Sequence, residues 1–270
     1  MAVFDLSITD HVSTLTLNRP DALNAMGPAF FEELPERMAE INETDAVRVV
    51  ILQAKGRAFS AGLDLKQMGP EILSPDAEAS PAERRRALRD LIQTMQDAMS
   101  SVADCRVPVI AAIHGACIGG GIDLITACDI RLAANDARFS VRETRMAMVA
   151  DLGTLQRIRD IVPEGHVAEL VYTGKDIPAS RAAEIGLVNR VLDDRERLQS
   201  AAREMAEQIA ANSPLAVEGA KHVLRASRDQ SVEEGLDYVA LWNTAFLPSD
   251  DLSEAMHAFV EGREPSFEGR

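Results

Sequence analysis

The sequence predicts an α/β fold that is built around a mostly parallel β-sheet. Three short, nearly continuous apolar runs, at residues 47–54, 107–113 and 129–133, have the composition of strands that are covered on both faces. A glycine-rich turn and a helical segment separate the second run from the third. Strands that alternate with helices indicate βαβ units, in which the strands run parallel.

The remaining elements follow in order along the chain. Residues 12–17 (VSTLTL) alternate between apolar and polar, as in a half-buried strand, and apolar residues recur at helical spacing from 28 to 42. Beyond Pro178 the pattern is helical, and the expected helices span 179–185, 198–212, 214–225, 232–246 and 251–261. We therefore expect two parts: a core of residues 1–197 that carries the functional site, and a helical region of residues 198–270 that packs on the core or on a neighbouring subunit.

The segment from Glu71 to Arg86 interrupts this order. It is polar, contains Pro75 and Pro81, and ends in three consecutive arginines. These features predict a mobile loop that leads into a solvated helix face. A lid over a bound substrate is the alternative.

Composition and charge exclude several classes of protein. The formal net charge of −15 argues against a nucleic-acid partner, because neutralising phosphates requires clustered Lys and Arg. No apolar run approaches the roughly 20 residues that span a bilayer, so we expect no membrane partner. The N-terminus shows no secretory signal and the C-terminus no peroxisomal tripeptide. Because three cysteines, an odd number, fit a reducing compartment, we expect a cytoplasmic protein.

The sequence predicts neither a metal site nor a redox cofactor. The five histidines show no metal-ligand spacing, and the cysteines form no C-x-x-C pair. The glycine-rich stretch 114–123 lacks the Gly-Lys-Ser/Thr ending of a P-loop and the G-x-G-x-x-G spacing of a dinucleotide site. Nucleotide binding is therefore not expected.

Two glycine-containing turns, at residues 56–64 and 114–123, follow two of the predicted buried strands. Each alone is explained by tight packing of a strand against a helix, because glycine allows close approach of the backbone. Together they fit a specific chemistry, in which backbone N–H groups from both turns converge on one carbonyl oxygen. Such an oxyanion hole stabilises the enolate that forms when a thioester loses its α-proton, and it requires no particular side chains.

At these residues the sequence resembles a known family. AFSAGLDLKQM (58–68) and HGACIGGGIDLITACDIRLA (114–133) are similar to the two signature regions of the crotonase, or enoyl-CoA hydratase/isomerase, superfamily, and NRPDALNAM (18–26) resembles its N-terminal motif near the coenzyme A entrance. The resemblance extends from about residue 12 to residue 263. It implies a spiral core of ββα repeats, a helical C-terminal region, and homotrimers that pair into hexamers.

The resemblance also implies roles for individual residues. By position, Ala61 and Gly120 supply the N–H groups of the oxyanion hole. No bound cofactor is implied, because coenzyme A enters as part of an acyl-CoA thioester substrate. Lys66 and Arg263 are candidate partners of its phosphates, although each is equally well explained as an ordinary surface cation. The full set implied for coenzyme A binding is Ala22, Leu23, Ala61, Leu63, Lys66 and Arg263.

Three acidic residues distinguish among the reactions of this superfamily. Its hydratases carry two glutamates at the positions of Asp123 and Glu143, so the first side chain here is one methylene shorter. A third acid, Asp151, stands where hydratases usually have glycine. The set of Asp123, Glu143 and Asp151 is similar to that of Δ3,5-Δ2,4-dienoyl-CoA isomerases, which implies an isomerase of unsaturated acyl-CoA in fatty acid degradation.

The proposed chemistry requires two separated proton-transfer groups. Converting a 3,5-diene to a 2,4-diene removes a proton from C2 and returns one at C6. We assign Glu143 as the base at C2 and Asp151 as the acid at C6, with the reverse order as the alternative, and Asp123 as an assisting group. Because three carboxyls in an apolar pocket cannot all ionise cheaply, at least one is expected to stay protonated near neutral pH, as a general acid requires.

Two other functions remain open from the sequence. The first is an enoyl-CoA hydratase, in which Asp123 and Glu143 activate one water molecule and Asp151 is incidental. The second is a non-catalytic acyl-CoA-binding protein that keeps the fold. Against the second stands the full set of acids together with both turns, because buried carboxyls are costly unless they are used.

Overall fold

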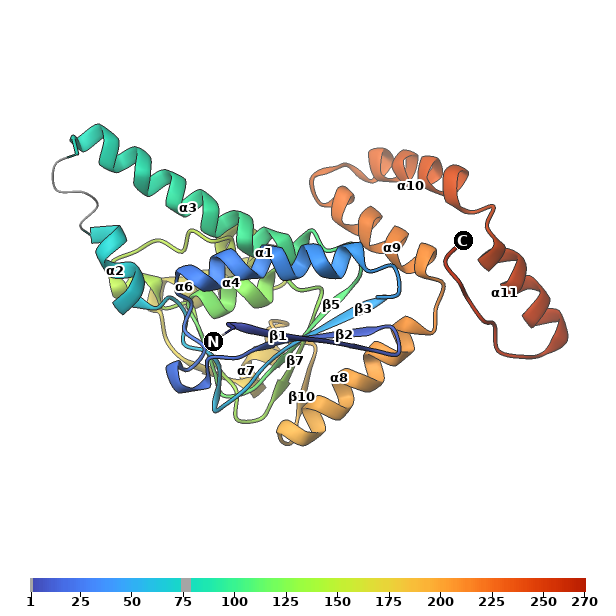
Figure 1. The fold of residues 1–270 in the computed structure, drawn as a ribbon, viewed down its shortest axis with the longest axis horizontal. Coiled ribbons are helices and arrows are strands. Elements are labelled where there is room, and N and C mark those ends of the chain that lie inside the picture. Colours follow the sequence, from blue (N-terminus) through green and yellow to red (C-terminus); the bar gives the residue numbers. More distant parts are fainter. Residues whose placement is uncertain (1, 74–78) are drawn as a thin grey trace.

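A computed structural model describes residues 2–73 and 79–270. In the described chain, two sheets form the body of the molecule (Figure 1). The larger sheet has the strand order β1-β2-β3-β5-β7-β10, and only the β1–β2 pair is antiparallel. Its strands are β1 (Phe4–Thr9), β2 (Val12–Leu17), β3 (Val49–Ala54), β5 (Val109–Ile113), β7 (Ile130–Ala134) and β10 (Arg190–Leu192). This confirms the mostly parallel sheet, to which β1 is an unpredicted addition.

The second sheet is small and holds the elements that form the site. Its strand order is β4-β6-β8-β9, and only the β8–β9 pair is antiparallel. The strands are β4 (Ala58–Ser60), β6 (Ala116–Ile118), β8 (Arg138–Ser140) and β9 (Ile177–Pro178). The consecutive pairs β3–β4, β5–β6 and β7–β8 each give one strand to each sheet, and a helical segment follows each pair. This arrangement is the spiral of ββα repeats that the family resemblance implied.

Helices cover both faces of the larger sheet. Helices α1 (Pro28–Glu43) and α3 (Pro81–Ala103) pack on one another over one face, and α8 (Arg195–Ala210) covers the other (Figure 1). The second face is sealed by alanines and a leucine of α8, which form a separate core cluster with residues of β2, β3, β5 and β7. The predicted boundary at residue 197 therefore divides a helix that belongs to the core, and the structural change comes after α8.

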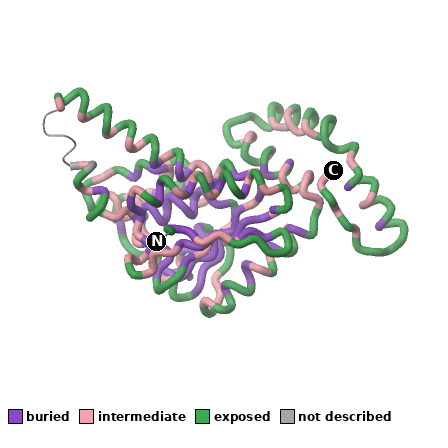
Figure 2. The backbone as a smooth tube through the Cα atoms, in the orientation of Figure 1, coloured by how far each residue is buried: buried purple, intermediate pink, exposed green. Residues whose placement is uncertain are grey.

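The C-terminal helices project away from the sheets. They are α9 (Pro214–Ala226), α10 (Val232–Phe246) and α11 (Asp250–Glu261), and their bounds agree with the prediction to within a residue. Figure 1 shows this arm beside the core, and Figure 2 shows that much of its surface is exposed. Helix α10 has no buried residue. In a single chain the arm thus leaves much of its surface uncovered.

The segment predicted as a loop at residues 71–86 is partly helical. Residues 71–73 end α2 (Leu65–Leu73), and residues 81–86 begin α3 behind the N-cap Ser80, whose side chain and that of Glu83 form a reciprocal capping box. The rest of the predicted loop and lid includes residues 74–78, which lie outside the described residues.

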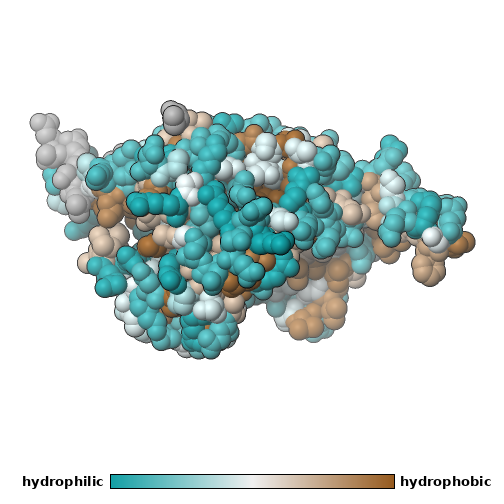
Figure 3. Space-filling view, turned by 90° about the horizontal axis from the view of Figure 1, so that it is seen from below, coloured by the Kyte–Doolittle hydropathy of each residue, from teal (hydrophilic) through white to brown (hydrophobic). Residues whose placement is uncertain are grey.

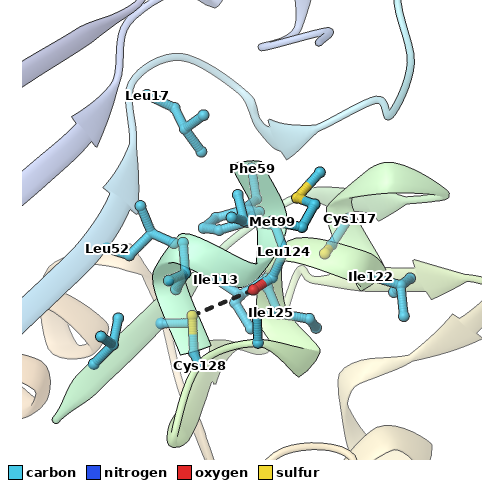
Figure 4. Close-up of a cluster of buried hydrophobic side chains, with 14 of the residues drawn as sticks. Leu17, Leu52, Phe59, Met99, Ile113, Cys117, Ile122, Leu124, Ile125 and Cys128 are labelled. Carbon is cyan, nitrogen blue, oxygen red and sulfur yellow. Dashed lines mark hydrogen bonds between the residues drawn. The ribbon is translucent and has the colours of Figure 1, made fainter. Parts of the chain in front are cut away.

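A short helix at the centre of the molecule positions the site. All seven residues of α4 (Gly120–Thr126) are buried. Its apolar side chains lie in the main core, and the Cys128 thiol that follows it donates to the Leu124 carbonyl oxygen at 3.4 Å (Figure 4). The shorter elements around it are η1 (Pro20–Ala22), η2 (Glu143–Met146), α5 (Thr154–Arg157), η3 (Ile158–Asp160), α6 (Glu164–Thr173), α7 (Ala179–Glu184) and η4 (Ser227–Asp229).

Candidate active site

A pocket of about 160 Å³ brings together both glycine turns and all three predicted acids. The turns contribute from β4 and β6, and the acids come from α4, from η2 and from the segment before α5. Apolar side chains complete the wall, as an acyl chain would require. The lining residues are Met26, Ala61–Leu63, Leu65, Ile118–Gly120, Asp123, Arg142, Glu143, Met146, Met148, Val149, Asp151 and Leu152.

The two turns touch through their backbones at Gly62. This residue has a φ of 84°, and a Cβ on it would lie 2.7 Å from the Ile118 carbonyl oxygen and 3.3 Å from the Gly120 nitrogen. The first distance is shorter than real Cβ contacts, so only glycine fits at this position. Two backbone hydrogen bonds hold the first turn in place: the Met26 N–H donates to the Gly62 carbonyl oxygen, and the Asp64 N–H donates to the Met26 carbonyl oxygen.

The available N–H groups differ from the prediction at one position. The amide of Ala61, predicted as an oxyanion-hole donor, already donates to the Leu23 carbonyl oxygen at 3.0 Å. It is therefore not free to donate to a substrate oxygen in the pocket. Within the described residues, the amides of Leu63 and Gly120 donate to no protein acceptor. A Cβ on Gly120 would lie 3.7 Å from the Leu63 nitrogen, which places the two amides side by side. The pair with the geometry of an oxyanion hole is therefore Leu63 and Gly120.

Asp123 is buried on α4 and is held by the backbone of a neighbouring segment. Its Oδ1 accepts a hydrogen bond from the Thr154 N–H at 2.7 Å. Burial raises the pKa of Asp123 to about 6, although the hydrogen bonding with Thr154 opposes this shift. The carboxyl is thus fixed in place and partly protonated near neutral pH.

Glu143 begins η2 and lies against the second glycine turn. A Cβ on Gly119 would be 3.3 Å from its Oε1, and among the described residues its buried Oε2 has no hydrogen-bond partner. Burial, aided by the charges of Asp123 and Asp151, raises the pKa of Glu143 to about 7. A buried carboxylate oxygen without a protein partner, with a pKa near the working pH, has the properties of a general base.

Asp151 lies at the edge of the same pocket. The residue is exposed, yet partial burial of its carboxyl raises its pKa above the ordinary value. Its backbone carbonyl accepts a hydrogen bond from the Gln96 side chain of α3 at 2.6 Å. Asp151 also raises the pKa of both Asp123 and Glu143, so the three acids are electrostatically linked.

The residues predicted to bind coenzyme A are distributed unevenly. Ala61 and Leu63 line the pocket, and the turn with Ala22 and Leu23 adjoins it through the Leu23 bond to Ala61. Lys66 is exposed on α2, one residue beyond the lining Leu65.

Arg263 is not brought to the pocket of its own chain. It follows α11 on the C-terminal arm, at the far end of the molecule from α2, and it pairs with Glu254 and Glu261 (Figure 1). Within a single chain Arg263 therefore lies away from the pocket, and its predicted contact with coenzyme A stays a prediction that an assembly of several chains would have to provide.

Sequence reasoning missed three residues around the site. Arg142 lines the pocket and pairs with Asp176, and Val149 is exposed at its edge. Thr154 is buried and supplies the amide that holds Asp123. The acid pattern could have directed attention to the segment between Glu143 and Thr154, but no residue type marks a backbone amide.

The described part of the chain offers neither a metal-binding cluster nor a membrane-spanning helix. It contains no group of three or more His, Cys, Asp or Glu residues placed to hold a metal ion. None of its helices is both long and apolar enough to cross a membrane.

Comparison with known proteins identifies the family. The sequence matches the enoyl-CoA hydratase/isomerase family over residues 7–270. It is 46% identical over 253 residues to a peroxisomal Δ(3,5)-Δ(2,4)-dienoyl-CoA isomerase of Arabidopsis thaliana, with 94% of this chain and 91% of that protein covered. A mitochondrial Δ(3,5)-Δ(2,4)-dienoyl-CoA isomerase of Dictyostelium discoideum is 45% identical, with 95% and 87% covered.

The fold has close counterparts among solved structures. An enoyl-CoA hydratase from Bacillus anthracis superimposes with a TM-score of 0.89 at 34% identity, and the match covers 99% of this chain and 100% of that one. The pocket, the paired glycine turns and the match over nearly the whole sequence agree: the chain belongs to the enoyl-CoA hydratase/isomerase family.

Proposed function

We propose that this protein is a dienoyl-CoA isomerase, which converts a 3,5-dienoyl-CoA to the 2,4-dienoyl-CoA during degradation of unsaturated fatty acids. The observation that carries the proposal is the third acid: Asp151 shares one pocket with Glu143, Asp123 and the paired turns. The relatives that are named as dienoyl-CoA isomerases cover most of this chain at 40–46% identity.

The reaction follows from the positions of these groups. The thioester oxygen accepts hydrogen bonds from the amides of Leu63 and Gly120, which stabilise the enolate. Glu143 removes the C2 proton, and the electron pair moves along the chain, so that C2=C3 and C4=C5 replace C3=C4 and C5=C6. Asp151 then donates a proton to C6. Two carboxyls are used because a single one does not reach both carbons.

The pKa values support this division of roles. A base with a pKa of about 7 is partly ionised at neutral pH and is strong enough to accept a proton in the transition state. The raised pKa of Asp151 favours the protonated form that an acid needs, and a bound acyl chain would bury this carboxyl further. Asp123 is restrained by Thr154 and assists by its effect on the pKa of Glu143.

The hydratase alternative makes a different use of the same residues. It requires Asp123 and Glu143 to hold one water molecule, yet Oδ1 of Asp123 is already engaged by the Thr154 amide. It also leaves Asp151 without a role, although the charge of Asp151 repels those of Asp123 and Glu143. We therefore rank hydration of a trans-2-enoyl-CoA below isomerisation.

An absorbance assay with a 3,5-dienoyl-CoA and a trans-2-enoyl-CoA tests the proposal. Conjugation of the new diene with the thioester raises near-ultraviolet absorbance, whereas hydration lowers it. We expect rapid isomerisation by the wild type and a loss of at least about 100-fold in Asp151→Asn, in line with typical general acid catalysis. Asp45→Asn, an exposed aspartate outside the pocket, is the matched control. Fast hydration with an indifferent Asp151 variant would establish the hydratase instead.

We also propose that the chain works as a trimer or a hexamer of paired trimers in the cytoplasm. Ten large hydrophobic residues of the C-terminal arm are exposed in the single chain, and Phe259 and Val260 are 87% and 84% accessible. Figure 3 shows hydrophobic surface on the end of the molecule that carries this arm. Exposed apolar surface of this extent is typical of subunit interfaces. A neighbouring arm is also the only source from which Arg263 could reach a bound coenzyme A.

A further inference from the structure

We infer that Arg157 is a positioning residue for the catalytic acids, because it clamps the turn of residues 151–154 from behind. This inference rests on the proposed function for the roles of Asp123 and Asp151. Arg157 is not among the residues that line the pocket. It acts through the backbone of the turn and through its charge.

The guanidinium lies directly against the turn. Nη1 of Arg157 donates to the Leu152 carbonyl oxygen at 3.2 Å, and a Cβ on Gly153 would collide with the same nitrogen. Gly153 has a φ of 117°, a conformation that favours glycine, and its lack of a Cβ leaves the space that the guanidinium occupies. On its other side, Nη2 donates to Ser100 Oγ of α3 at 2.9 Å. Arg157 therefore ties the turn to the body of the molecule.

The positions of two of the three acids, Asp151 and Asp123, depend on this turn. Its first residue is Asp151, whose carbonyl oxygen is held by Gln96 of α3. Its last residue, Thr154, donates its amide to Asp123 at 2.7 Å. If the turn moved, Asp151 and the restraint on Asp123 would move together. The clamp thus sets the separation between the acid at one end of the acyl chain and the carboxyls at the other.

The positive charge of Arg157 also lowers the pKa of Asp123. It opposes the burial that raises the pKa of Asp123, and Asp123 in turn opposes the lowering of the pKa of Arg157 by burial. A merely structural arginine would stabilise the turn without changing the protonation of an acid in the pocket. The two roles therefore differ in pH dependence.

Kinetics of three variants separate these roles. In Arg157→Gln we expect kcat for the dienoyl-CoA to fall by roughly 10–100-fold, because small displacements of reacting groups cost this much, while KM changes little. The pH–rate profile should change as well, because loss of the cation raises the pKa of Asp123 and thereby alters the charge that acts on Glu143. Arg157→Lys keeps the charge but not both hydrogen bonds, so it should restore the profile and only part of kcat. Arg159→Gln, an exposed arginine two residues away, should match the wild type.

A measurement without substrate keeps the inference independent of the proposed function. Carbon-13 NMR of labelled aspartate carboxyls, with Asp123 assigned by its Asn variant, gives the pKa of Asp123 directly. A higher pKa in Arg157→Gln and an unchanged pKa in Arg159→Gln would support the inference even if the wild type isomerised nothing. An unchanged pKa, or equal kcat in the Gln variant and the wild type, would overturn it.

A second variant covers the case in which Arg157→Gln does not fold. Ser100→Ala removes one anchor of the guanidinium and leaves every charge in place. We expect a smaller loss of kcat that is not accompanied by a shift in the pH profile. A Ser100→Ala enzyme with wild-type kcat would contradict the clamp.

Discussion

Gly62→Ala tests the close approach of the two glycine turns, which meet at Gly62. Alanine there would place a Cβ 2.7 Å from the Ile118 carbonyl oxygen, well inside the 3.4 Å at which ordinary contact begins. The residue would also have to keep a φ of 84°. Because the close neighbour is backbone, no rotation of a side chain relieves the collision, and the turns must separate.

Two effects of different size follow from this separation. The left-handed conformation costs alanine about 1–2 kcal/mol, and relief of the collision adds a strain of about 1–3 kcal/mol. The effect on catalysis is larger, because Leu63 follows Gly62 directly and Gly120 lies across the contact. Losing the alignment of one oxyanion donor typically lowers kcat about 100- to 1000-fold. We therefore expect a moderately destabilised protein that is almost inactive.

The assay follows absorbance of the 2,4-dienoyl-CoA product, with thermal unfolding measured on the same samples. Gly165→Ala is the matched control, since a Cβ at residue 165 meets nothing within 4 Å. It should be fully active. A folded Gly62→Ala protein with a kcat within about threefold of the wild type would refute the argument, because such a change is far below the loss of one donor.

Two further predictions concern stability and assembly. Burial raises the pKa of Glu143 from 4.5 to about 7, so the fold loses stability as the pH rises through this range, by up to about 3 kcal/mol before solvent screening. Glu143→Gln should therefore raise the melting temperature at pH 8 but not at pH 4; equal shifts at both values would contradict the assignment. Phe259→Glu should release monomers in light scattering, whereas Ser253→Glu on the same helix should release fewer, and an unchanged mass would argue against an interface at Phe259.

The sequence predicted most elements because their signals are local. Continuous apolar runs marked β3, β5 and β7, and helical spacing marked α1 and the C-terminal helices to within a few residues. The small sheet escaped prediction because β4, β6 and β8 are three residues long. Strands this short contain too few residues to show a period. Their pairing depends on the larger sheet, which places their ends side by side.

The site was predictable in its side chains but less so in its backbone. The resemblance to the family implied Asp123, Glu143 and Asp151, and the structure places them in one pocket. The amide of Ala61 was mispredicted as a donor because sequence does not reveal which N–H group a turn has already used. That information lies in the bond to Leu23, a residue 38 positions earlier in the chain. The unpredicted role of the Thr154 amide has the same origin.

The short side chain at residue 123 gains a physical explanation from this geometry. An aspartate on the buried helix α4 reaches the Thr154 amide at 2.7 Å, and this bond fixes its carboxyl beside the turn that begins at Asp151. A glutamate would extend one methylene further into a pocket of only about 160 Å³ and would leave less room for an acyl chain. In the proposed mechanism the same turn therefore supplies the distal acid, Asp151, and restrains Asp123, the residue at the position of a hydratase carboxylate. Under the proposed function, weaker activation of water and a second proton-transfer group are thus two consequences of one local structure.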